Sequence, residues 1–177
     1  MKILATDLRR RTLLGAGLTA VAGVAISCRS TSSSNWRFFT DDEARTVEAI
    51  TAQLIPSGPG PGAREAGVIN YIDIQLAGRF RKHRKTYREA IPKVDEASRK
   101  AAGKRFVELA SDQQIDVLNT IEEHQKAFFQ LILAHTRQGF YGDPRHGGNR
   151  NMVSWKMLGL PFPPVRGRQH YGEPKVG

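Results

Sequence analysis

Histidine and cysteine are the residues of this chain that could bind a metal or a redox cofactor, and they are few and scattered. The single cysteine, Cys28, belongs to no CxxC or CxxCH pattern, so an iron–sulfur cluster or a covalently attached haem has no ligand set. His124 and His135 would share one side of a continuous helix but lie about 16 Å apart along its axis, too far for one metal. A haem with one histidine ligand is compatible with the sequence, although no residue favours it. We therefore predict no metal and no cofactor in this chain.

Other patterns that carry chemistry are also missing from the sequence. No GxGxxG follows a strand-like segment, so dinucleotide binding has no support. Nothing resembles a nucleophile elbow or a phosphate-binding loop. We therefore predict no catalytic residues in this chain, and expect it to act by binding another molecule.

Residues 1–27 have the composition of an export signal. A basic start precedes an apolar run that is too short to span a bilayer as a helix. Arg10 and Arg11 stand one residue before Leu13 and Leu14, which resembles the twin-arginine pattern of leaders that export folded proteins. An ordinary secretory leader is the alternative. Either leader predicts a mature protein outside the cytoplasm.

Cys28 follows a run of small and apolar residues, an arrangement that resembles a lipoprotein processing site. We expect a lipid on Cys28 to anchor the mature chain at the periplasmic side of the cytoplasmic membrane. The alternative is peptidase cleavage that leaves an unmodified thiol. The polar segment 28–35 would serve as a short tether to the folded domain.

The remainder of the chain predicts a single all-α domain over residues 36–162, with Pro/Gly-rich loops. Thr40 and Glu43 form a capping box that starts a helix, and the Pro/Gly-rich segment 56–62 ends it. A second apolar stripe at helical spacing covers residues 68–76. Residues 163–177 form a basic, Gly/Pro-rich tail.

Three further signals set the expected boundaries of the later helices. Pro92 is expected to start a second short helix within the basic segment. A capping box at residues 111–114 is expected to start a helix whose apolar face includes Ile115. That pattern continues past His124 and His135 to a stop at Gly139.

The segment 79–105 is strongly basic, with eleven Lys or Arg against three acidic residues. It could be a solvated helical face, a docking surface for an acidic partner or a surface for anionic lipid. Nucleic acid is not expected, because only Phe80 and Tyr87 are interleaved as stacking aromatics and an exported protein rarely meets it.

The segment 139–161 carries turn-forming and anchoring residues close together. Gly147 and Gly148 allow positive φ and close backbone approach, and Asn149 can bond to neighbouring amides. This loop could pack on its own core or present a binding edge. The residues predicted to form a partner interface are Asp143, Pro144, Gly147, Gly148, Asn149, Arg150, Trp155, Gly159 and Pro161.

This C-terminal pattern, DPxxGGNR followed by Trp155 and Gly159-Leu160-Pro161, resembles the signature of the gluconate 2-dehydrogenase subunit 3 family. The segments Leu54–Pro56 and Tyr71–Asp73 and the Phe-rich stretch 128–129 also resemble that family, so the similarity covers most of residues 36–162.

The resemblance implies a non-catalytic small subunit of a membrane-associated sugar or polyol dehydrogenase. Its large subunit would be an FAD-containing flavoprotein of the glucose–methanol–choline oxidoreductase type, and a multihaem cytochrome c subunit would take the electrons onward. The small subunit would bind the folded large subunit, through the basic segment 79–105 and the loop 143–161, and carry it through the twin-arginine translocase. The rival hypothesis is a stand-alone exported helical lipoprotein that acts as a binding module.

Overall fold

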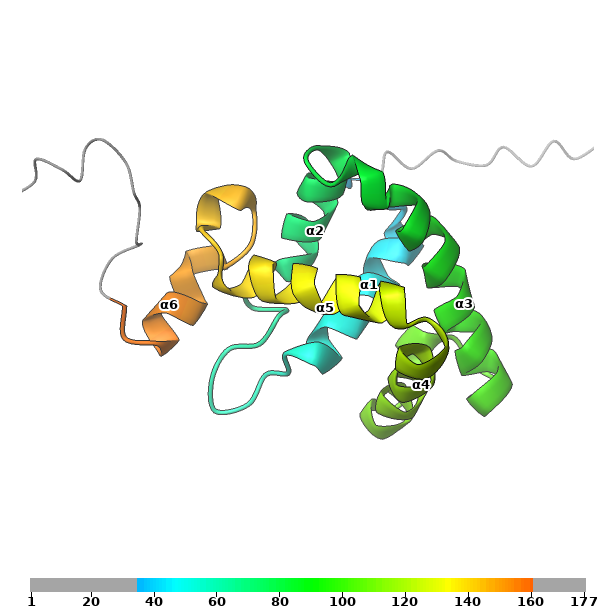
Figure 1. Cartoon of the computed structure of the whole chain (residues 1–177). Helices are drawn as coiled ribbons and strands as arrows, with labels where there is room; N and C mark the ends of the chain where they lie inside the picture. Colours follow the sequence, from blue (N-terminus) through cyan, green and yellow to red (C-terminus); the bar gives the residue numbers. More distant parts are fainter. Residues whose placement is uncertain (1–34, 161–177) are drawn as a thin grey trace, which may run out of the picture. The chain divides into compact units, whose positions relative to one another are not determined.

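The computed structural model describes residues 35–160 and is built from helices joined by loops and short 3₁₀ turns (Figure 1). Within this range no strand is present, which confirms the predicted all-α class. None of the described helices has the length and hydropathy needed to cross a bilayer. The helices are α1 (Asp41–Leu54), α2 (Val68–Ala77), α3 (Arg84–Ala102), α4 (Ser111–His124), α5 (Lys126–Tyr141) and α6 (Val153–Met157).

Helix α5 is the centre of the described domain, because each of the other five α-helices packs against it. Figure 1 shows α5 crossing in front of α1, with α6 beyond its C-terminal end. The apolar face of α5 buries Phe128, Ile132 and Phe140 in a core that also takes Tyr87 from α3 and Phe106 from the α3–α4 loop. Burial of such side chains, at about 1.5–3 kcal/mol each, is the main source of stability for a helical domain of this size.

The predicted start and end of α1 are confirmed. The Thr40 hydroxyl accepts a hydrogen bond from the Glu43 amide at 3.3 Å, and the Glu43 carboxylate accepts from the Thr40 amide at 2.8 Å. The helix ends at Leu54, two residues before Pro56. Local sequence signals were sufficient at both ends.

The expectation that Pro92 starts a second helix is wrong, because α3 continues through it. A proline inside a helix removes one backbone hydrogen bond and costs roughly 3 kcal/mol. Residues on both sides of it, including Tyr87, Ile91 and Val94, are buried on one face of α3. Packing of this continuous face outweighs the local penalty.

The start of α4 differs by one residue from the predicted capping box. The Gln113 side chain accepts from the Ala110 amide, so Ser111 is the first helical residue rather than the cap. With this register, Ile115 is exposed and Gln114 is buried, where its amide donates to the Phe106 carbonyl at 2.8 Å. The inward position of Gln114 depends on its hydrogen bond to the α3–α4 loop. Local sequence patterns do not predict such a contact.

The predicted continuation of one helix to Gly139 is also wrong. The chain breaks at Gln125, so His124 and His135 lie in different helices, and α5 ends at Tyr141. Gly139 is therefore an interior residue of α5. It is placed where a Cβ atom would press against the Tyr71 ring at 3.0–3.2 Å.

The first described residues are held to the domain by a buried carboxylate of α2. Asp73 accepts hydrogen bonds from the backbone amides of Arg37, Phe38 and Phe39 at 2.8–3.1 Å. Three hydrogen bonds from amides offset the cost of burying this charged carboxylate, and they fix the position of the segment that donates them. The chain therefore joins the domain beside α2.

Candidate functional site

The segment that follows α5 is folded onto the domain as an ordered loop. It begins with a 3₁₀ turn at Pro144–His146, and the Asp143 carboxylate caps this turn by accepting from the Arg145 amide at 2.9 Å. The Arg145 guanidinium also pairs with this carboxylate, at 2.7 Å, and the pairing lowers the pKa of Asp143. Asp143 and Pro144 thus set the direction of the loop by local bonds.

Two glycines let the loop approach the helices closely. At Gly148 a Cβ atom would overlap the carbonyl oxygen of Gly139 in α5, so any side chain would push the loop away. At Gly147 φ is +95°, and a Cβ atom would lie 2.5 Å from Ile74 Cδ1 of α2. The expected needs for positive φ and for close backbone approach are confirmed, one at each glycine.

Asn149 fixes the loop from inside. Its side chain is fully buried at a φ of +43°, and its amide nitrogen donates to the Gly142 carbonyl at 3.0 Å. Its side-chain oxygen accepts from the Ser154 amide at 3.0 Å, and its backbone amide donates to the Gly139 carbonyl at 2.8 Å. Asn149 therefore joins the end of α5, the loop and the start of α6.

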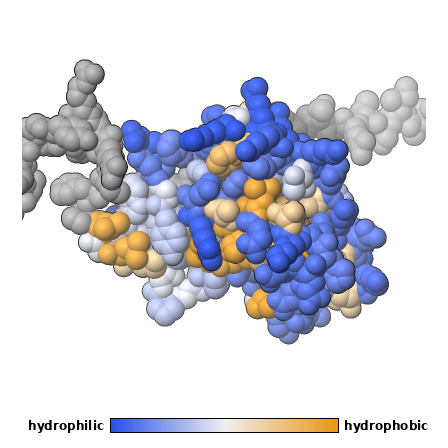
Figure 2. Space-filling model, viewed as in Figure 1, coloured by the Kyte–Doolittle hydropathy of each residue, from blue (hydrophilic) through white to orange (hydrophobic). Residues whose placement is uncertain are grey.

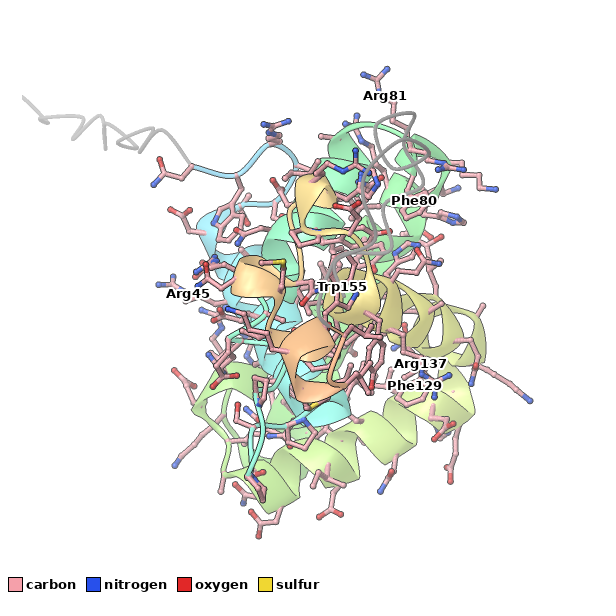
Figure 3. The ribbon with its side chains drawn as sticks, turned by 90° about the vertical axis from the view of Figure 1, so that its left-hand side faces the viewer. Arg45, Phe80, Arg81, Phe129, Arg137 and Trp155 are labelled. Atoms are coloured by element: carbon pink, nitrogen blue, oxygen red, sulfur yellow. The ribbon has the colours of Figure 1, made fainter. Side chains whose placement is uncertain are left out.

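Arg150 and Trp155 attach the loop to the rest of the domain. The Arg150 amide donates to the Ala66 carbonyl at 2.9 Å, and its guanidinium lies against Gly67. Trp155 is 5% exposed, and its indole nitrogen donates to the Tyr141 carbonyl at 2.8 Å. Figure 3 shows Trp155 beside α5. Within this chain, these motif residues serve to hold the loop in place.

Apolar side chains that the motif did not indicate are exposed around this loop. They come from the end of α5, the turn before α6, and α6 with the residues after it, and Figure 2 shows the corresponding apolar surface where α6 lies. The nearest signal in the sequence is the apolar run that follows Trp155. We name this set the α6 apolar surface; its members are Tyr141, Met152, Met157, Leu158 and Leu160, with exposed fractions of 36–56%.

The backbone beneath this surface is unusual. Asn151 and Met152 have φ values of +56° and +57°, which are rarely adopted by residues other than glycine. Such a conformation costs of the order of 1 kcal/mol or more and persists where the surroundings impose it. It places the Met152 side chain 36% exposed beside α6.

A buried aromatic cluster around His135 is a second feature that the sequence did not reveal. The His135 ring is stacked on Phe80, with centroids 4.6 Å apart, and on Tyr87, with centroids 5.9 Å apart. The His83 ring makes an edge contact with the His135 ring, with centroids 5.6 Å apart. Because His135 is 3% exposed, its imidazole has no access to a substrate in the described structure.

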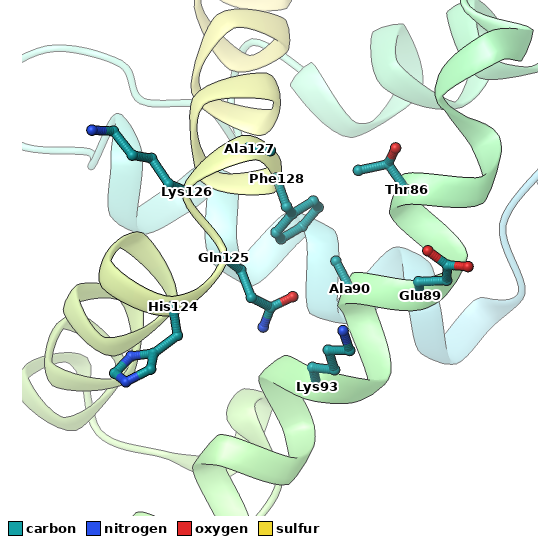
Figure 4. A pocket seen from close by; sticks show the side chains of 9 residues that line it. All are labelled: Thr86, Glu89, Ala90, Lys93, His124, Gln125, Lys126, Ala127 and Phe128. Carbon is teal, nitrogen blue, oxygen red and sulfur yellow. The ribbon is translucent and has the colours of Figure 1, made fainter.

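A pocket with charged groups in its lining lies between α3 and the α4–α5 junction (Figure 4). It has a volume of about 310 Å³, with the buried Phe128 among its lining residues. Lys93, His124 and Lys126 also line it, and Figure 4 shows their side chains spread apart rather than converging on one point. Within residues 35–160 no three His, Cys, Asp or Glu residues are grouped closely enough to hold a metal ion.

Several predicted residues lie outside the described range. They are Arg10, Arg11, Leu13 and Leu14 of the leader, Cys28, and Pro161 at the end of the motif. Gly159, by contrast, is described: it has a φ of +69° and follows the short helix α6, as expected for a residue that ends a helix.

The comparison with known proteins gives one informative result. No curated protein sequence and no solved structure shows significant similarity to the chain. A family model described as gluconate 2-dehydrogenase subunit 3 matches residues 41–161, which include every described helix and the motif loop. The chain therefore belongs to the gluconate 2-dehydrogenase subunit 3 family, whose name marks an accessory subunit of a dehydrogenase complex.

Proposed function

We propose that this chain is the non-catalytic small subunit of a periplasmic, membrane-associated, FAD-dependent dehydrogenase that oxidises a sugar or polyol. In this proposal the chain binds a large subunit of the glucose–methanol–choline oxidoreductase type, which holds the FAD and the substrate. A multihaem cytochrome c would accept the electrons. Family membership supports the accessory role.

The observation that carries the proposal is the α6 apolar surface. Single exposed apolar residues are normal on a soluble domain, but four of these five lie within residues 152–160, and Figure 2 shows apolar atoms gathered where α6 lies, as at protein interfaces. Met and Tyr are enriched at the cores of such interfaces. We therefore place the large-subunit contact here, with the motif residues as its support.

The packing beneath the surface suits this role. Asn149 and Trp155 hold the loop to α5 from inside, so the exposed side chains stand on a fixed backbone. A preformed surface loses less conformational entropy when it binds, and more of the burial energy appears as affinity. The buried motif residues would then support the loop, and the exposed apolar side chains on it would contact the partner.

The leader supplies the second half of the proposal. A twin-arginine signal moves proteins that are already folded, so the small subunit could carry a leaderless, FAD-loaded partner across the membrane. Lipidation at Cys28 would then keep the pair at the membrane. Folding, flavin loading and export would occur in that order.

The test is co-purification of a flavoprotein with the tagged full-length chain from its native host. Leu158→Glu, which places a charge on the α6 apolar surface, should remove the flavin absorbance spectrum from the purified material. Ile115→Glu is the matched control, since Ile115 is 47% exposed on α4 and outside that surface. Both variants change exposed side chains, so both should keep the wild-type unfolding temperature within a few degrees.

The two variants separate the hypotheses. Flavin retained by Ile115→Glu and lost by Leu158→Glu supports the assigned interface. Flavin retained by both would move the interface elsewhere on the domain. A wild-type chain that never carries flavin would refute the proposal and favour a stand-alone helical lipoprotein.

A further inference from the structure

The basic segment 79–105 is not one uniform surface in the folded domain. In its C-terminal part, two arginines have an acidic partner within the domain: the Asp95 carboxylate pairs with Arg105 at 3.3 Å and lies 4.0 Å from Arg99. Arg105 also reaches Asp42 of α1 at 3.5 Å. Arg105 therefore ties the segment after α3 to α1, whereas Lys100 and Lys104 are exposed and take part in no salt bridge within residues 35–160.

The N-terminal part of the segment 79–105 contains exposed cations that are closely spaced along the chain. Arg79, Arg81, Lys82 and Lys85 are exposed where α2 turns into α3, and Arg37 is exposed in the segment that Asp73 holds. We call these five residues the cationic corner. Among the salt bridges within residues 35–160, only Lys85 takes part, in a long pair of 3.8 Å with Glu89. Figure 3 shows Arg81 at the edge of the domain, where its Nε donates to the Ala77 carbonyl at the end of α2 at 3.0 Å.

The contacts of Arg84 show that the two parts of the cationic corner, the α2–α3 turn and the segment that contains Arg37, are adjacent. Its guanidinium donates to the carbonyls of Leu76 and Ala77, at the end of α2, at 2.6 and 3.2 Å. The same guanidinium carbon lies 5.3 Å from the centroid of the Phe38 ring. One side chain therefore spans from the α2–α3 turn to the first described residues, and Figure 1 shows both at the same end of the domain.

The acidic groups nearest to this corner are already paired. Glu43 is bound by Arg88, which also donates to the Phe38 carbonyl at 2.5 Å, and Asp73 is occupied by three backbone amides. Glu89 faces Lys85. Positive charge on Arg37, Arg79, Arg81 and Lys82 is thus left without a local acidic partner in the described part of the chain.

We propose that the cationic corner is a docking surface for an anionic phospholipid bilayer, and that it turns this end of the domain toward the membrane. Basic side chains near a membrane surface are attracted by the negative charge of its headgroups, at short range and in a salt-dependent way. This inference does not depend on the identity of the dehydrogenase partner.

The length of chain that precedes the corner supports this choice of partner. Cys28 precedes Asn35 by seven residues, and an extended chain covers at most about 3.5 Å per residue. An anchor at Cys28 would therefore hold Asn35 within about 25 Å of its attachment point in any conformation. The cationic corner would be kept close to the headgroups. Its effective concentration at the membrane surface would be high, so that weak attractions of single side chains would be sufficient for docking.

The test measures partitioning of the purified full-length chain onto phosphatidylcholine vesicles with and without phosphatidylglycerol. The corner variant combines Arg37→Gln, Arg79→Gln and Lys82→Gln. The control variant combines Lys100→Gln, Lys104→Gln and Lys156→Gln, exposed lysines at the end of α3, just beyond it and in α6. Both variants lose three positive charges and keep the same leader. A difference between them therefore reports where on the domain the charges lie.

We expect the corner variant to bind phosphatidylglycerol vesicles at least about tenfold more weakly than wild type, since each basic residue near the surface strengthens binding roughly fivefold. The control variant should stay close to wild type, and high salt should remove the difference. Equal weakening in the two variants would show that net charge alone matters and would overturn the proposal. Equal binding by wild type and corner variant would also overturn it, and would leave an acidic protein as the partner of this corner.

Discussion

The Tyr87 hydroxyl and Nδ1 of His135 are joined by a 2.9 Å hydrogen bond in the interior, linking α3 to α5. The two rings are also stacked, with 4° between their planes. Burial, together with nearby His83, lowers the pKa of His135 to about 4, and burial raises the pKa of the Tyr87 hydroxyl. Both groups are therefore neutral at pH 7, and the pair holds two helices together without charge.

This pair predicts a defined pH dependence of stability. In the unfolded chain His135 takes up a proton near its ordinary pKa of 6.5, whereas in the folded domain it does so only near 4. The unfolded state binds more protons between these values, so the free energy of unfolding is greatest above pH 6.5 and falls as the pH drops toward 4. The expected loss is up to roughly 3 kcal/mol, measured by urea unfolding at a series of pH values.

The variant His135→Gln isolates this contribution, because its amide can still bond to Tyr87 but does not titrate. Its stability is expected to be lower at pH 7 and to change less between pH 6.5 and 4. His124→Gln is the control, because it makes the same substitution at an exposed histidine. An unaltered slope in His135→Gln would mean that other groups account for the pH dependence.

Asn149 should be one of the most sensitive positions of the motif loop. Asn149→Ala leaves the Gly142 carbonyl and the Ser154 amide without their partner and places alanine at a φ of +43°. We expect a loss of about 2–4 kcal/mol in the free energy of unfolding. Asn151→Ala is a matched control, because Asn151 has a similar φ of +56° but is exposed. A comparable loss in both variants would assign the effect to backbone strain alone.

Gly148→Ala tests the close approach of the loop to α5. The added methyl group would overlap the Gly139 carbonyl, and neither backbone can yield without moving a helix or the loop. We expect a loss of about 3 kcal/mol or more, seen as a lower urea midpoint. Gly58→Ala, at a position where no atom lies within 4 Å of the added carbon, should change stability by about 0.5 kcal/mol or less.

The sequence was sufficient where a structure depends on neighbours along the chain. The capping box at Thr40 and the proline-rich end of α1 are local, and both were predicted correctly. The backbone requirements at Gly147 and Gly148 were also local in origin, because glycine is the residue that meets them.

The failures have long-range causes. Gln114 turns inward, where it donates to the Phe106 carbonyl, and Ile115 is exposed instead, whereas Leu118 and Ile121 of the predicted apolar face are buried. Pro92 remains inside α3 because the residues around it are buried together. The α6 apolar surface was missed because exposure, unlike helical periodicity, depends on what the other helices leave uncovered.

Export of the pair gives the last prediction. In the full-length chain, Arg10→Lys with Arg11→Lys keeps the leader charge but removes the paired guanidinium groups by which twin-arginine leaders are recognised. The large subunit's dehydrogenase activity, assayed with an artificial dye as acceptor, should then move from the periplasmic to the cytoplasmic fraction. Total activity should be retained, because the pair would still fold and take up flavin.

Arg9→Lys is the matched control, since it changes the adjacent arginine and leaves the pair intact. A general secretory leader requires only positive charge, so it would export both variants equally. Unchanged periplasmic activity in the double variant would therefore exclude export of the folded pair by this leader. Loss of small subunit from the periplasm with the large subunit still exported would show that the two chains cross separately, and would restrict the small subunit's role to binding after export.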